Sequence, residues 1–102
     1  MVRTKRRKPL LARKLLQIRK TLGLSQNQMI IRMGLEDYLL REEISDFERN
    51  KRIPSLEVIL QYARVANVYV EALIDDDLEL PKKLPSKLKS EGVKRMAKSK
   101  VN

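Results

Sequence analysis

The sequence predicts an all-α protein with five short helices packed around one core. Apolar residues recur at spacings of three and four, capping residues separate the apolar segments, and no segment alternates as a β-strand does. The 102 residues are enough for one domain. We therefore expect a basic arm over 1–9, a helical domain over 10–76, and an acidic and then basic linker and tail over 77–102.

The first predicted helix spans 10–22 and ends before Gly23, which can adopt the left-handed conformation of a C-cap. The second predicted helix spans 26–33. Ser25 is expected to be its N-cap, with Gln28 as the partner in a capping box. The apolar positions of the first helix are Leu11, Leu15, Ile18 and Leu22.

Gly34 ends the second helix, and the following segment 35–40 is ambiguous, with Asp37 able to start one helical turn. The third helix is expected over 41–49, with Asn50 in the left-handed position at its end. The apolar positions expected in the core from the second and third helices are Met29, Ile30, Met33, Ile44 and Phe47.

A fourth helix is expected to begin after Pro54, with Ser55 as its N-cap, and to end near Asn67. A fifth helix, over 70–74, stops at the acidic run 75–77, and prolines interrupt the chain beyond that run. The predicted inner face of the fourth helix is formed by Leu56, Ile59, Leu60 and Ala63.

The formal net charge is +10, and the positive charge lies at the two ends of the chain. Residues 1–20 carry nine Lys or Arg and no acid, and residues 82–102 carry eight Lys or Arg and one Glu. Residues 21–81 carry six basic and twelve acidic residues. The positive sign of the net charge indicates a polyanionic binding partner. The arm cannot bury apolar surface, so we expect it to be disordered in isolation.

Several kinds of chemistry are excluded by residue type. There is no cysteine for a disulfide or thiolate site and no histidine to act as a base or metal ligand. No nucleophile–base pair or phosphate-binding loop can be drawn, so we expect no enzyme activity, cofactor or metal. The acidic run 75–77 lacks the glycine of a calcium loop. No apolar segment suits a signal peptide or membrane span, so we expect a cytoplasmic, nucleoid-associated protein.

A series of short motifs occurs in order over residues 10–75. They are Ile18-Arg19-Lys20, Gly23-Leu24-Ser25-Gln26, Gly34, Ile44-Ser45-Asp46-Phe47-Glu48-Arg49, Lys51-Arg52, Pro54-Ser55-Leu56-Glu57, Ala66-Asn67-Val68 and Ala72-Leu73-Ile74. Together they are specific, and this part of the sequence resembles the Cro/repressor-type (XRE-like, lambda-repressor-like) helix-turn-helix family. The resemblance implies that the second helix lies across a DNA phosphate backbone and that the third enters the major groove.

The resemblance also implies which residues contact DNA. Gln26, together with Gln28, would contact a phosphate at the start of the second helix. Independently of the resemblance, we expect an arm containing Arg6 and Arg7 to enter the minor groove, as homeodomain arms do. Glu48 is expected to pair with an arginine instead. The base-reading positions on the third helix are Arg41, Glu42, Ser45 and Asp46. The phosphate contacts expected after them are Arg49, Lys51 and Arg52.

Two features depart from the family pattern. Gly34 and Ile44 enclose nine residues where about five are usual, so the turn is longer by four, and Ile30 replaces the usual small residue. The larger side chain of Ile30 would push the third helix away from the second, and a longer turn permits that displacement. We therefore interpret both departures as a single variant of the helix-turn-helix motif. Three of the acids of the third helix, Glu42, Glu43 and Asp46, would face the DNA. A carboxylate can select cytosine, and the basic ends would restore affinity.

We therefore expect a sequence-specific transcriptional regulator, a repressor, bound to double-stranded DNA. A dimer on two half-sites is expected from the resemblance, and the candidate dimer contacts are Leu78, Leu80 and Leu84. The alternatives are a protein-interaction module using the acidic centre, an antitoxin whose tail holds a toxin, and an RNA-binding factor acting through the basic tails.

Overall fold

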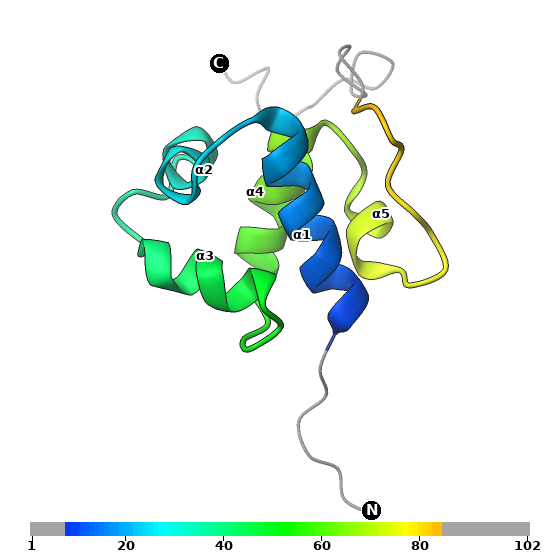
Figure 1. Ribbon diagram of the computed structural model, residues 1–102, viewed down its shortest axis with the longest axis horizontal. Coiled ribbons are helices and arrows are strands. Elements are labelled where there is room, and N and C mark those ends of the chain that lie inside the picture. Colours follow the sequence, from blue (N-terminus) through cyan, green and yellow to red (C-terminus); the bar gives the residue numbers. More distant parts are fainter. Residues whose placement is uncertain (1–7, 85–102) are drawn as a thin grey trace, which may run out of the picture.

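The computed structural model describes residues 8–84, and these form helices and connecting turns with no strand. Figure 1 shows α1 and α4 in the middle of the molecule, α2 and α3 on one side and α5 on the other. Five helices are therefore confirmed within the described range. They are α1 (Pro9–Leu22), α2 (Gln26–Met33), α3 (Arg41–Glu48), α4 (Leu56–Ala66) and α5 (Val70–Ile74).

The helix ends follow the predicted capping residues. Ser25 Oγ accepts a hydrogen bond from Gln28 N at 3.0 Å while Gln28 Oε1 accepts one from Ser25 N at 2.8 Å, so the capping box is confirmed. Ser55 Oγ accepts from Val58 N in the same way at the start of α4. The left-handed residues that end or follow the helices are Gly23, Gly34, Asn50 and Asn67.

One core holds the helices together. It is formed where α1 packs against α3, α4 and α5 and where α2 packs against α3 and α4. Removing these side chains from water supplies the main driving force for folding. The five positions predicted from α2 and α3 are all buried. The fully buried large side chains are Tyr62, Leu15, Ile18, Met29, Ile44, Leu73 and Val58.

The prediction for α4 was wrong at Leu56, and the predicted Leu60 is only half-buried. Leu56 is 79% exposed, and the buried face is instead shifted onto Val58 and Tyr62, beside the predicted Ile59 and Ala63. Apolar residues occur on most sides of this helix, so their spacing fits more than one face. Leu56 is the first residue of α4, at the edge of the contact with the core.

Three smaller expectations change. The 35–40 segment forms a turn rather than a helix, and the turn begins at Leu35 rather than at Asp37. The carbonyl of Leu35 accepts hydrogen bonds from Tyr38 N and Leu39 N, both at 2.9 Å. Helix α3 ends at Glu48, one residue early. Leu80 is only 7% exposed, because the segment after α5 returns to the core, so this residue cannot be an exposed dimer contact.

The segment after α5 is attached to α1 by a buried lysine. Lys14 is only 6% exposed, and its Nζ donates to the carbonyl oxygens of Ala72 at 2.8 Å and Asp75 at 3.0 Å. The Ala72 carbonyl lies near the end of α5, and the Asp75 carbonyl, which follows the helix, also accepts from Leu78 N at 3.1 Å. The ammonium group binds both carbonyls and complements the helix dipole. Residues 1–7 and 85–102, with the arm and most of the predicted tail, lie outside the described residues.

Candidate nucleic-acid interface

A polar network fixes the positions of α1, α2 and α3 relative to one another. Arg19 Nε and Nη2 donate to the two carboxylate oxygens of Glu48 at 2.6 and 2.9 Å, and Arg19 Nη1 donates to Leu24 O at 3.0 Å. Gln26 Nε2 donates to Glu48 Oε1 at 3.1 Å. The predicted pairing of Glu48 with an arginine is therefore confirmed. Each of the three helices contributes one side chain, so the network links α1, α2 and α3 directly.

The outer face of α3 carries the predicted base-reading side chains. Ile44 and Phe47 are buried, so the opposite face is turned to solvent. Arg41 and Glu42 are exposed in its first turn, and Ser45 and Asp46 follow one turn later, half-buried. Residues four apart lie on the same side of a helix. The structure thus places the four predicted positions on the solvent side of α3, two of them exposed and two half-buried.

Besides Glu48, two more of the four acids of α3 have basic partners. Asp46 pairs with Arg49 at 3.6 Å and with Arg52 at 3.7 Å. Glu43 pairs with Arg52 at 3.6 Å and also accepts a hydrogen bond from Leu40 N at 2.9 Å. These partly exposed pairs add little stability. The arginines do offset the negative charge of Glu43 and Asp46. The outer face of α3 therefore repels a polyanion less than its acidic residues alone would.

The remaining predicted contacts surround α3. Gln26 is half-buried at the start of α2 and uses one amide hydrogen on Glu48, which leaves its second one for another acceptor. Gln28 is exposed, and both its backbone N and its side-chain oxygen serve the capping box. Lys51 is exposed in the loop after α3, where its backbone N donates to Asp46 O at 2.8 Å.

The start of α1 lies beside this loop. Lys8 N donates to Asn50 Oδ1 at 3.2 Å, and Figure 1 shows the beginning of α1 and the loop after α3 at the same end of the molecule. Sequence reasoning gave Asn50 only a backbone role, because a contact between residues 42 positions apart leaves no local pattern. Arg6 and Arg7 lie outside the described residues, immediately before this anchored point.

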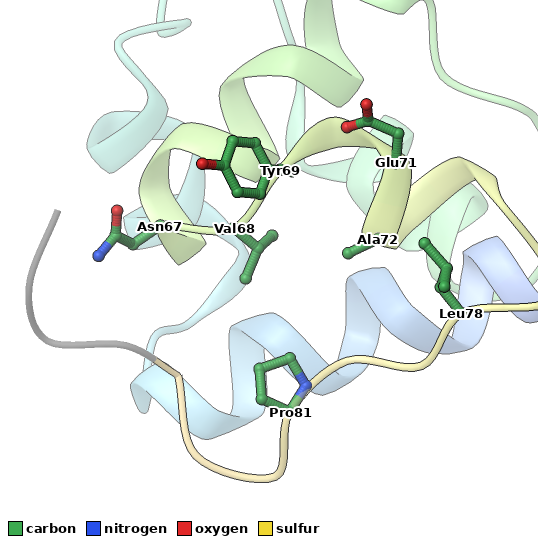
Figure 2. Close-up of a pocket in the computed structure, with 7 residues that line it drawn as sticks. All are labelled: Asn67, Val68, Tyr69, Glu71, Ala72, Leu78 and Pro81. Carbon is green, nitrogen blue, oxygen red and sulfur yellow. The ribbon is translucent and has the colours of Figure 1, made fainter. Parts of the chain in front are cut away.

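A second surface feature lies on the α5 side of the molecule. Figure 2 shows a groove bounded by the α4–α5 connection, α5 and the returning segment, with Tyr69 and Leu78 at its edges. The groove measures about 570 Å³ and its lining is almost wholly apolar. Its lining residues are Asn67, Val68, Tyr69, Glu71, Ala72, Leu78 and Pro81. Leu78, one of the candidate dimer contacts, is 43% exposed there.

Within residues 8–84 no group of three or more His, Cys, Asp or Glu side chains is arranged to hold a metal ion. No helix among these residues is both long enough and apolar enough to cross a membrane.

Comparisons with known proteins find solved structures only. No family model and no curated protein matches the chain. The restriction-modification controller protein C.AhdI from Aeromonas hydrophila is 27% identical, with a TM-score of 0.55, over 65% of this chain and 94% of that one. SinR, described as the master regulator for biofilm formation and solved in complex with DNA, is 26% identical, with a TM-score of 0.55, over 64% of this chain and 98% of that one.

A SinR/SinI protein complex gives 25% identity and a TM-score of 0.57 over 66% of this chain. In that case the match spans 62% of the other chain, less than two thirds of its length. C.AhdI and SinR are named as regulatory proteins rather than enzymes.

Proposed function

We propose that this chain, which has the Cro/repressor-type (XRE-like) helix-turn-helix fold, is a sequence-specific DNA-binding transcriptional regulator that acts as a repressor. It inserts α3 into the major groove of double-stranded DNA. The observation that carries the proposal is the exposed outer face of α3, held by the Arg19–Glu48 pair and flanked by basic side chains. The likeness to C.AhdI and to DNA-bound SinR supports it.

Base reading is assigned to the start of α3. The Arg41 guanidinium can donate two hydrogen bonds to guanine, the Glu42 carboxylate can accept one from cytosine N4, and the Ser45 hydroxyl can do either. Asp46 has a different role in this proposal, because it already pairs with two arginines. Its ion pairs partly neutralise Arg49 and Arg52 beside the interface.

Affinity comes from contacts to phosphates around α3. The proposed contacts are Gln26 and Gln28 at the start of α2 and Arg49, Lys51 and Arg52 after α3. The hydrogen bond from Lys8 N to Asn50 supports a further contribution from Arg6 and Arg7, because it anchors the basic arm beside the same loop. Each phosphate neutralised releases counterions, so binding should weaken as salt rises.

We further propose that the protein acts in the cytoplasm at the nucleoid as a homodimer, since α3 covers only a few base pairs and two half-sites multiply its selectivity. A second candidate function is a protein-interaction module, which the apolar groove and exposed Leu78 favour. In that case the fold would serve to hold a protein partner, as an antitoxin does.

The test is a selection from random duplex DNA with the full chain at about 0.15 M salt. The proposal predicts enrichment of one defined motif, with Arg41→Ala altering the preference at one base position of it. Enrichment of no motif, together with binding that disappears as salt rises, would overturn it and leave the protein-interaction function.

A further inference from the structure

Leu40 occupies the N-cap of α3, a position where leucine has no structural advantage. Its backbone is extended, with φ −108° and ψ 156°, and it has no oxygen in its side chain to accept from the first turn. Ser, Thr, Asp and Asn are preferred at this position because they can accept that hydrogen bond. Only one half of a capping box is present, the hydrogen bond from Leu40 N to Glu43 Oε1.

Leu40 also contributes little to the core. Its side chain is 66% exposed, whereas that of the preceding residue, Leu39, is only 6% exposed. Leu39 therefore fills the core, whereas Leu40 is directed into solvent. A large apolar side chain is therefore presented at a position that capping and packing would both assign to a small polar residue.

The residues that follow Leu40 indicate what its side chain could contact. Arg41 and Glu42 follow it directly and are exposed on the face proposed to meet the base edges. In the major groove the bases offer hydrogen-bonding groups and one apolar group, the C5 methyl of thymine. That methyl group is the only base-edge feature that a leucine can complement.

We propose that Leu40 is a specificity-determining residue that selects thymine by packing against its C5 methyl group in the major groove. This inference rests on the proposed function and deepens it, because it names a base that the polar side chains of α3 do not explain. Burying one methyl group from water is worth about 0.8 kcal/mol, which corresponds to about a fourfold change in affinity.

The test replaces each thymine of the selected motif in turn with uracil, which lacks only the methyl group. For the unaltered protein, uracil at one position per half-site should weaken binding by about fourfold. Leu40→Ser should bind the thymine and uracil duplexes equally at that position. The serine can also cap α3, so the variant should fold, and circular dichroism checks this.

Leu56→Ser is the matched control, since it makes the same substitution at a leucine that is 79% exposed at the start of α4. It should keep the full uracil penalty. Equal binding of thymine and uracil duplexes by the unaltered protein at every position, or an unchanged penalty in Leu40→Ser, overturns this inference alone. Failure of the selection to yield a motif overturns the proposed function and this inference with it.

Discussion

Arg19 and Glu48 form a two-pronged ion pair between α1 and the last residue of α3, with 15% and 5% of their side chains exposed. The hydrogen bond to Glu48 raises the pKa of Arg19, while burial of the guanidinium opposes the rise. Arg19 therefore remains charged at neutral pH. A buried charge is tolerated only when paired, so the two residues depend on each other.

Glu48→Ala should lower the free energy of unfolding by about 3 kcal/mol, because it leaves Arg19 charged, mostly buried and without its partner. In a domain of this size the midpoint of thermal unfolding should fall by more than about 10 °C. Calorimetry with Glu36→Ala, an exposed acid in the α2–α3 turn, provides the control. A loss below about 1 kcal/mol would show that the pair does not organise the interface.

Tyr62→Phe should leave stability at neutral pH unchanged or slightly higher. The hydroxyl of Tyr62 is buried and has no hydrogen-bond partner among the described residues, so removing it relieves a desolvation penalty. Urea unfolding at pH 7 measures the difference. A loss greater than about 1 kcal/mol would indicate that the hydroxyl has a bonding partner.

The same tyrosine should make the protein sensitive to alkali. Burial raises the pKa of Tyr62 above its usual value of 10.0, and the charge of Glu48 adds to the effect. The unfolded chain then loses this proton first, so stability should be complete below pH 10 and fall as the pH rises above it. Tyr62→Phe should show a shallower decline. Equal declines in both proteins would exclude Tyr62 as the cause.

Lys14→Met should destabilise the protein by about 1–3 kcal/mol, because it removes the donor that satisfies the carbonyls at the end of α5. The methionine fills similar space, so the loss reports the hydrogen bonds rather than a cavity. Arg13→Met, at the exposed neighbouring position, should have little effect. The contrary result would be equal unfolding midpoints for the two variants.

Asp46→Asn should strengthen binding to all DNA sequences alike, since it removes a negative charge from the interface and frees Arg49 and Arg52 for phosphates. Its effect on stability should stay within about 0.5 kcal/mol. Binding titrations over a range of salt measure the change against Asp77→Asn, the same charge change beyond α5. A loss confined to one base pair of the motif would instead make Asp46 a base reader.

Lys51→Ala and Arg41→Ala should differ in kind. Lys51→Ala should weaken binding to every duplex and reduce the dependence of log K on log salt by about one unit. Arg41→Ala should relax the preference at one base position by about 1–3 kcal/mol. Affinities for duplexes that carry each of the four bases at that position separate the two outcomes. A uniform loss for Arg41→Ala would remove it from the base-reading group.

The sequence predicted the helices well because their ends are encoded locally. Ser25, Gly34 and Asn67 each act within a few residues of their own position, and short-range hydrogen bonds are visible in sequence. The inner face of α4 was less predictable. Leu56 and Ile59 are equally apolar, and only contacts with the other helices decide which of them is buried.

Only part of the candidate interface was predictable from the sequence. The resemblance located the outer face of α3 and suggested a partner for Glu48. It did not reveal that Gln26 donates to the carboxylate of Glu48 or that Lys8 N donates to Asn50. It also did not reveal that Arg52 forms ion pairs with two acids. These contacts join residues far apart in the chain, so no local pattern records them. Leu40 was missed because its exposure depends on how Leu39 packs.

The proposed function depends above all on the reading of a DNA sequence by α3. Its most direct test is the ratio of affinities of the full chain for the selected motif and for a scrambled duplex of equal length, at about 0.15 M salt. The proposed function predicts that the motif binds at least about a thousandfold more tightly, and that Arg41→Ala reduces the ratio. Equal affinity for the two duplexes would contradict it, since binding would then depend on charge alone.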